Sequence, residues 1–186
     1  LFSSILFSMN KIYPELTPRQ MSIIRGTSIG DGSLRIHGVT GSLGLGQGSK
    51  QLPYLEWKCN ELFPLITASI HRITSKDHLV RGKIFRATEG YCVSSRSHPL
   101  LTEFYHQIYP NGGRVKSFNQ EYFDALDPLA IAVWYMDDGN LAYGKYQSTE
   151  GLGLRIYPSI TINTQAFSKE ANEQIASHLT NKYAIY

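Results

Sequence analysis

The chain has little of what marks several large protein classes. Its 186 residues include only two cysteines, Cys59 and Cys92, too few for a disulfide framework and not spaced as a CxxC motif. The six histidines fall at no metal-ligand spacing, so they give no support to a zinc or HNH-type site. No apolar run approaches the roughly 18 residues of a membrane span, and the first nine residues lack the basic start of a signal peptide. We therefore expect a globular protein with no membrane partner.

The chain does have material for a core and an uneven charge. Hydrophobic residues make up 42% and aromatic residues 12%, while the net charge is only +3. Eight basic residues but only three acids lie between Arg72 and Lys116. Such a segment fits a polyanionic partner, because neutralising phosphates releases counterions. A solvated basic surface without a ligand is the alternative.

Two stretches begin and end in the same way, LTPRQMSIIRGTSIGDG and LDPLAIAVWYMDDG. Each begins with a capping residue and a proline, Thr17-Pro18 in the first and Asp127-Pro128 in the second. Each ends at Asp-Gly, Asp31-Gly32 in the first and Asp138-Gly139 in the second. In the first stretch Gln20 also completes a capping box. The pattern predicts two copies of one helix.

Alternating apolar and polar residues follow each predicted helix. SLRIH (33–37) and LRIYPSITIN (154–163) both read as half-buried strands, and we match them to each other. Each strand region then reaches a glutamine, Gln47 or Gln165, and another helix. Further strands are predicted at 69–74 and 83–95, and a further helix after Ser97. The polar faces suit either solvent or nucleic acid.

The paired helices have a reason to meet closely. Gly26 and Gly30 lie four residues apart on one helix face, and an interior glycine costs a helix on the order of 1 kcal/mol relative to alanine. This favours close approach of another backbone. Packing the two helices side by side would bring Asp31 and Asp138 together at the negative ends of both helix dipoles, where a divalent cation is the natural third party.

The segments IRGTSIGDG (24–32) and IAVWYMDDG (131–139) resemble the two motifs of LAGLIDADG homing endonucleases. SITINTQAFSKEANEQIASHLTNKY (159–183) is similar to the strand, turn and helix that come after the second motif in the monomeric, two-motif branch encoded by organelle introns. The resemblance implies an α+β fold of two pseudo-symmetric αββαββα units with an antiparallel DNA-binding saddle. We expect an N-terminal extension at 1–15, a first unit at 16–112, a linker at 113–126 and a truncated second unit at 127–186.

The resemblance also implies roles for particular residues. Asp31 and Asp138 would be the catalytic acids that bind Mg²⁺ or Mn²⁺, Gly30 and Asp137 would offer backbone carbonyls to the metal, and Arg96 would be the basic residue near a scissile phosphate. The DNA-binding residues would be Ser33, Arg35, His37, Gln47, Lys50, Lys83, Arg86, Arg155, Tyr157, Thr161, Asn163 and Gln165.

The function implied is site-specific cleavage of double-stranded DNA by a monomer, in the mitochondrion or alternatively the chloroplast. Proteins of this family also act as intron maturases, which bind intron RNA and assist splicing. YMDD also occurs at the metal site of polymerase palms, but there the acids lie in a strand hairpin, whereas Asp127-Pro128 starts a helix here. A purely structural Asp-Gly helix end is the remaining alternative.

Overall fold

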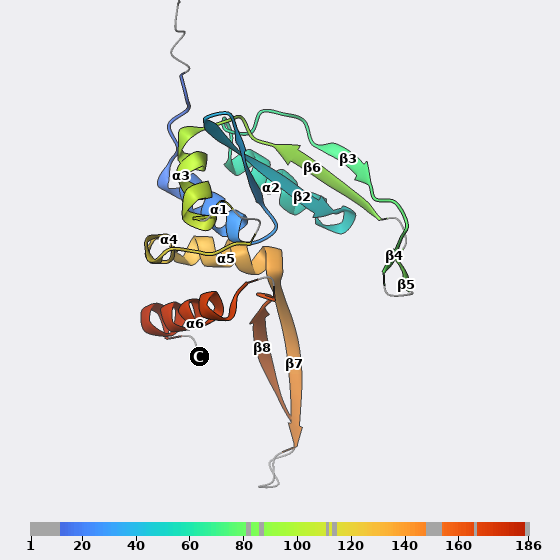
Figure 1. Cartoon of the computed structure of the whole chain (residues 1–186). Coiled ribbons are helices and arrows are strands. Elements are labelled where there is room, and N and C mark those ends of the chain that lie inside the picture. The colour runs from blue at the N-terminus through green and yellow to red at the C-terminus, as the bar shows by residue number, and fades with distance from the viewer. Residues whose placement is uncertain are drawn as a thin grey trace, which may run out of the picture.

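The computed structural model describes residues 12–80, 83–85, 88–110, 112, 115–147, 154–165 and 167–184. Its elements follow the order α1 (Pro18–Ile29), β1 (Ser33–His37), β2 (Thr40–Gly48), the 3₁₀ turn η1 (Ser49–Gln51), α2 (Leu52–Glu61), β3 (His71–Thr74), β4 (His78–Val80), β5 (Lys83–Phe85), β6 (Glu89–Ser94), α3 (Pro99–Ile108), α4 (Gln120–Asp124), α5 (Pro128–Asp138), β7 (Gly139–Gln147), β8 (Leu154–Ile162) and α6 (Lys169–Tyr183). Figure 1 shows α1, α3, α4, α5 and α6 gathered on one side, α2 beside β2 of the four-stranded sheet, and the β7–β8 hairpin extending away from the helices.

The helices α1 and α5 start where the sequence predicts. The Thr17 hydroxyl accepts a hydrogen bond from the Gln20 backbone N–H, and the Gln20 side chain accepts one from the Thr17 backbone N–H at 3.0 Å. The Asp127 carboxylate accepts a hydrogen bond from the Ala130 backbone N–H at 2.8 Å. Both predicted caps are therefore confirmed, and each helix is followed directly by a hairpin.

The two helices pack side by side at small residues. A Cβ at Gly26 would lie 2.2 Å from the carbonyl oxygen of Ala130, and a Cβ at Gly30 would lie 2.5 Å from the Cβ of Asp137. The Ser22 hydroxyl donates a hydrogen bond to the Asp127 carboxylate across the same interface. The close approach predicted from the glycines is thus confirmed, and it sets the two motif ends beside each other.

The first repeat forms an antiparallel sheet of order β1-β2-β6-β3, and β7 and β8 form a separate antiparallel pair. Helix α3 packs on β1 and β2 with its apolar side, where Leu101, Phe104 and Ile108 are buried. One hydrophobic core runs from Leu16 to Ile175 and includes both motif helices. In the described part of the chain, no helix is long and apolar enough to cross a membrane.

The repeat is real, but the strand matching made from the sequence is wrong. Element order is α1-β1-β2-α2 in the first repeat and α5-β7-β8-α6 in the second, so SLRIH corresponds to β7 and LRIYPSITI corresponds to β2. Strand β2 reads TGSLGLGQG, and its glycines hide the alternation that identifies the other strands. The predicted strand at 83–95 is also divided, into β5 and β6.

The β7–β8 hairpin was expected to bury one apolar face, yet Ile156 is 61% exposed and Ile160 is 69% exposed. In the first repeat the corresponding strands are covered by α3, whereas no described helix follows α6 to cover β7 and β8. The C-terminal end of β8, together with α5 and α6, lines an apolar groove of about 710 Å³.

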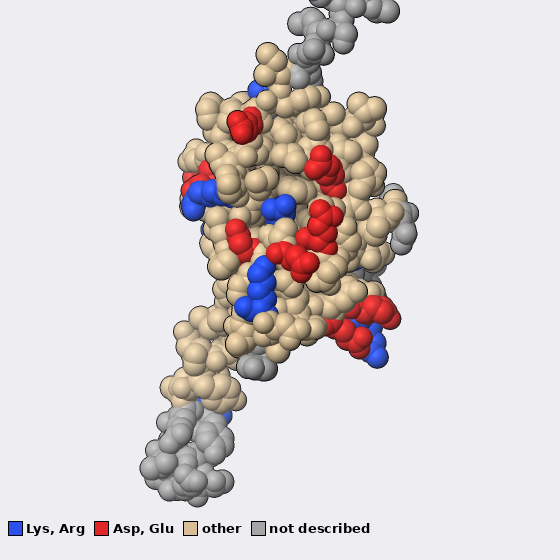
Figure 2. All heavy atoms as spheres, turned by 90° about the vertical axis from the view of Figure 1, so that its left-hand side faces the viewer, with Lys and Arg blue, Asp and Glu red and all other residues tan. Residues whose placement is uncertain are grey.

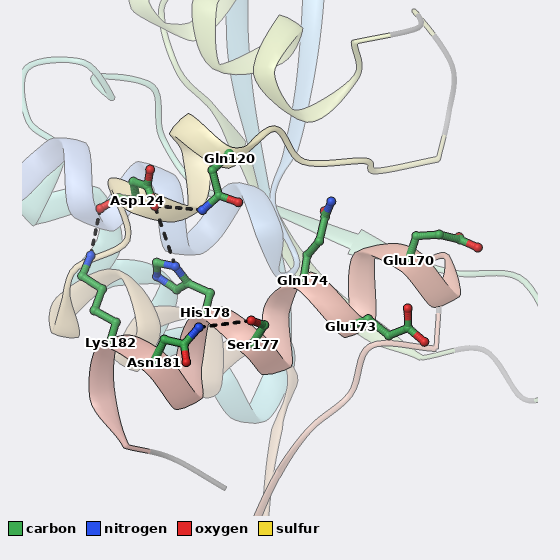
Figure 3. Close-up of a pocket in the computed structure, with 9 residues that line it drawn as sticks. All are labelled: Gln120, Asp124, Glu170, Glu173, Gln174, Ser177, His178, Asn181 and Lys182. Atoms are coloured by element: carbon green, nitrogen blue, oxygen red, sulfur yellow. Dashed lines mark hydrogen bonds and ion pairs between the residues drawn. The ribbon is translucent and has the colours of Figure 1, made fainter.

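The region 113–126, predicted as a linker, contains α4 and contributes Phe118, Tyr122 and Phe123 to the core. Helix α6 is attached to it by polar contacts that Figure 3 shows. The Lys182 ammonium donates hydrogen bonds to the carbonyls of Asp124 and Leu126, both at 2.8 Å. The second repeat is therefore held to the first by this structured segment as well as by α5.

Candidate active site

Three carboxylates lie where the paired helices end. Asp31 is exposed in the turn between α1 and β1, while Asp137 and Asp138 are the last two residues of α5. Carboxylates at the C-terminal end of a helix face its negative pole, which is unfavourable unless a cation compensates. Burial raises the pKa of Asp138, and the charge of Asp31 raises it further, while Lys116 opposes both effects. The two motif aspartates therefore repel each other.

Gln47 connects the two motif ends. It lies near the end of β2 and is buried, and its Nε2 donates hydrogen bonds to Asp31 Oδ2 and to Asp137 Oδ1, both at 3.2 Å. The sequence predicted Gln47 as a DNA-binding residue, and the structure places it against the acids. One amide therefore holds a carboxylate from each repeat.

Asp137 is neutralised by a lysine that the sequence analysis missed. Lys58 Nζ lies 2.6 Å from Asp137 Oδ1 and 2.9 Å from Oδ2, and the two side chains are 1% and 0% exposed. The ammonium also lies 4.4 Å from the centroid of the Tyr54 ring. Burial raises the pKa of Asp137 to about 6, and the positive charge of Lys58 limits that rise. A detectable signal existed, because Lys58 occupies the same face of α2 as the buried Leu55 and Leu62.

Lys116 is the second missed residue. Its Nζ donates hydrogen bonds to the carbonyls of Ile29 and Gly30, both at 2.7 Å, and so caps the end of α1. Burial lowers the pKa of Lys116, while the charges of Asp138, Asp31 and Asp137 oppose that shift. The carbonyl of Gly30, predicted as a metal ligand, is one of these two acceptors.

The structure does not bring Arg96 to the acids. Strand pairing sets Gln47 opposite Tyr91 in β6, and Arg96 lies beyond the C-terminal end of that strand, five residues after Tyr91. At about 3.3 Å per residue this separates the Arg96 backbone from Gln47 by roughly 16 Å. The sequence looked for the basic residue in the second hairpin, whereas Lys116 comes from the segment before α5.

Each motif aspartate opens into its own pocket. Asp31 lines one of about 350 Å³ together with Gln47, Gln51 and residues of β3 and β6. Asp138 lines another of about 320 Å³ with Lys116, Asn163 and Gln165. The pockets repeat one arrangement, an aspartate in the same pocket as a glutamine near the end of the second strand of each repeat. The copies differ, because Gln165 is exposed and donates only a long hydrogen bond, 3.4 Å, to Asn163 Oδ1.

Most of the predicted DNA-binding side chains that the structure describes are exposed, on the strands or just beyond their ends. Arg35, His37 and Lys50 are exposed in the first repeat, and Ser33 is half-buried. Tyr157, Thr161 and Asn163 are exposed in the second. Arg86 lies outside the described residues, as do the side chains of Lys83 and Arg155.

The residues present fit a hard divalent cation better than zinc. Within the described ranges, no three side chains among His, Cys, Asp and Glu are grouped to hold a metal ion. Mg²⁺ needs only one or two carboxylates, since water and phosphate oxygens complete its shell. Asp31 and Asp138 can supply these two, because both Asp137 oxygens already contact Lys58.

The sequence is similar to one family of endonucleases and to several curated proteins. The model of the LAGLIDADG DNA endonuclease family matches residues 21–186. Curated relatives include Protein RecA of Mycolicibacterium flavescens, 36% identical over 178 residues, and Protein RecA of Mycolicibacterium chitae, 30% identical over 178 residues. In both cases the match covers 91% of this chain but only 37% of the relative, so the chain spans just over a third of their length.

Solved structures show the same fold. The homing endonuclease I-WcaI, solved bound to its DNA recognition sequence, superposes with a TM-score of 0.71 at 18% identity, over 93% of this chain and 71% of that one. A mutant of I-SmaMI superposes with a TM-score of 0.52 at 14% identity, over 91% and 74% of the two chains. On its sequence, and consistently with its fold, the chain belongs to the LAGLIDADG DNA endonuclease family.

Proposed function

We propose that the chain acts as a site-specific endonuclease on double-stranded DNA and uses Mg²⁺ or Mn²⁺ held by Asp31 and Asp138. One observation carries the proposal. Two crossing helices deliver an aspartate each to neighbouring positions, and Gln47 joins the two motif ends through Asp31 and Asp137. Two acids that repel each other, on a protein of mildly basic charge, favour a site for a cation and a polyanion.

Asp31 and Asp138 would hold the metal ion. When bound, such an ion activates water as a nucleophile and stabilises the charge that develops on a phosphate. The supply of two carboxylates, one from each repeat, suits a reaction that must occur once on each DNA strand. The Asp31 pocket and the Asp138 pocket would then serve one strand each.

The surrounding residues position these groups. Gln47 restrains Asp31 through the hydrogen bond to Oδ2. Lys116 brings a positive charge into the Asp138 pocket, where it can contact a phosphate oxygen while still capping α1. Exposed side chains on the strands, such as Arg35 and Tyr157, would contact DNA on both sides of the acids. I-WcaI, whose fold is similar, is solved bound to its DNA recognition sequence, which supports this partner class.

The test is cleavage of a randomised double-stranded DNA library by the purified chain with Mn²⁺, followed by sequencing of the cut ends. We expect one recurring site, cut on both strands, and loss of cutting by at least about 100-fold in Asp31→Asn and Asp138→Asn. Cleavage that persists in both variants would contradict the proposal. So would uncut DNA combined with faster splicing of an intron RNA, which would identify a maturase.

A further inference from the structure

The buried ion pair between Lys58 and Asp137 has no equivalent among the described residues of the second repeat. Asp137 directly precedes the motif aspartate of α5, and the residue that precedes the motif aspartate of the first repeat is Gly30, at the C-cap of α1. Lys58 lies as many residues after Gln47 as Ala176 lies after Gln165, so Ala176 is the counterpart of Lys58 in the second repeat. An acid and a base therefore occur together on one side of the pseudo-twofold, while glycine and alanine stand on the other.

The pair is built into the helix crossing. Asp137 occupies space that any side chain at Gly30 would need, since a Cβ there would lie 2.8 Å from Asp137 Oδ2. Lys58 is enclosed by the Tyr54 ring, and the Tyr54 hydroxyl donates a hydrogen bond to the carbonyl of Val133 on α5. Both Asp137 oxygens contact Lys58, so this carboxylate is directed away from any metal.

The pair also touches the residue that restrains Asp31. Asp137 Oδ1 accepts hydrogen bonds from both Lys58 Nζ and Gln47 Nε2, and the same Nε2 donates to Asp31 Oδ2. Lys58 is thus connected to one motif aspartate through two side chains. In the second repeat, Gln165 is exposed and has no such buried partner.

We propose that Lys58 is a positioning residue, which fixes Asp137 so that Gln47 holds the Asp31 carboxylate in place for a divalent cation. The inference rests on the proposed function and deepens it. It assigns Lys58 and Asp137 to the support of the Asp31 half of the site, and it excludes the Asp137 carboxylate as a ligand. It also makes the two halves unequal, with the Asp31 half the more rigid.

The test measures Mn²⁺ binding by the metal-free chain, with the ion itself as the probe and electron paramagnetic resonance as the readout. The double variant Lys58→Met/Asp137→Ala removes both charges and so leaves no unpaired ion. We expect its affinity for Mn²⁺ to fall about 10-fold, as for other residues that orient a metal ligand. Gln47→Leu should cause a similar loss, and combining it with the double variant should add nothing further, because both act through one contact.

Arg19→Met is the control. It breaks the more exposed ion pair with Glu61, at the opposite end of α1 from Asp31, so we expect Mn²⁺ affinity to stay within about twofold of the parent. A loss in the double variant as large as that of Asp31→Asn would make the Asp137 carboxylate a ligand and overturn the inference. Unchanged affinity in a folded double variant would also overturn it, by showing that the pair only stabilises the fold. Should the double variant fail to fold, unchanged affinity in Gln47→Leu would overturn the inference in its place.

The DNA reaction separates positioning from stability. With DNA and Mn²⁺, the double variant should nick one strand more slowly while the other strand is cut at the parent rate, whereas an equal loss on both strands would contradict the proposed asymmetry. Failure of the proposed function would look different. In that case Asp31→Asn and Asp138→Asn would bind Mn²⁺ as the parent does, whatever happens at Lys58.

Discussion

At the scale of single residues, the site combines carboxylates that need a cation with two lysines that supply positive charge at fixed points. Lys58 neutralises Asp137, and Lys116 caps α1 beside Asp138. Both ammonium groups are largely buried, and burial lowers their pKa while the nearby carboxylates oppose the shift. The lysines therefore belong to the site as much as the aspartates do.

Lys116 should have separable effects on stability and on catalysis. Lys116→Met removes charge-assisted hydrogen bonds to two carbonyls, and we expect it to lower the free energy of unfolding by about 2 kcal/mol. The same change should slow DNA cleavage by about 100-fold if the ammonium contacts a phosphate in the transition state. Thermal unfolding and single-turnover kinetics would measure the two effects.

Lys116→Arg is the control for that prediction. It retains the charge and can still cap the helix, so most of the stability should return. A Lys116→Met variant that loses stability but cleaves DNA at the parent rate would restrict Lys116 to a structural role.

The sequence identified the motif residues because their signal is local. Asp31 and Asp138 each precede a glycine at the end of a capped helix, and two such endings can be seen in one chain. Lys58 and Lys116 act through contacts that are distant in sequence, 79 residues apart for Lys58 and Asp137. Nothing near Lys116 in the chain indicates that it will lie at the end of α1.

At the scale of elements, the central feature is the crossing of α1 and α5 at Gly26. Gly26→Val would force a side chain against the Ala130 carbonyl and the Val133 Cβ, which lie 2.2 Å and 2.9 Å from the position of its Cβ. We expect a loss of about 3 kcal/mol in the free energy of unfolding, measured by chemical denaturation. Gly46→Ala is the control, since its nearest contact is 3.9 Å away and it should change stability by less than about 0.5 kcal/mol. If the two substitutions changed the free energy of unfolding equally, the close approach of α1 and α5 at Gly26 would not be needed for stability.

The contact between α4 and α6 should depend on pH through His178. Burial lowers the pKa of His178, the charge of Lys182 lowers it further, and Asp124 opposes both. The folded chain therefore binds a proton at His178 less readily than the unfolded chain. Its contribution to stability is complete above the ordinary histidine pKa of about 6.5 and is lost as the pH falls through the lower folded value.

Melting temperatures between pH 8 and pH 5 test this dependence. The parent should lose more of its melting temperature over that range than His178→Gln, which has no group to titrate there. A variant whose melting temperature falls as steeply as that of the parent would assign the acid sensitivity to other groups.

Strands were harder to predict than helices, for a physical reason. A capped helix leaves several coincident signals, whereas a strand leaves only alternation, which the glycines of β2 remove. The exposed apolar face of β8 shows the other limit. Ile156 and Ile160 alternate as if half-buried, but whether a second layer covers them is decided by elements elsewhere in the chain.

At the scale of the whole molecule, Figure 2 shows acidic side chains on the helical face with basic side chains among them. Helix α4 carries Glu121 and Asp124, and α6 carries Glu170 and Glu173 together with Lys169 and Lys182. Further exposed basic residues, Arg35, Lys50 and Lys145, lie in the strand regions and at η1. The mixed charge of the helical face would favour the strands as the side that meets DNA.

The salt dependence of DNA binding would reveal which face binds. Replacing Arg35 and Lys50 by glutamine should reduce the slope of log K against log salt by about 2, provided that each residue contacts a phosphate. Binding would be measured in EDTA, so that the DNA stays intact. Lys169→Gln on α6 is the control and should leave the slope unchanged, because this residue lies on the helical face. A larger effect from Lys169 would place the DNA on the helices.

The most direct test of the central claim is the position of bound Mn²⁺ in crystals of the chain with DNA, located by its anomalous scattering. The account predicts a peak contacted by the carboxylates of both Asp31 and Asp138, with Asp137 still paired to Lys58. A peak bound by Asp137, or no peak at either motif aspartate, would contradict it.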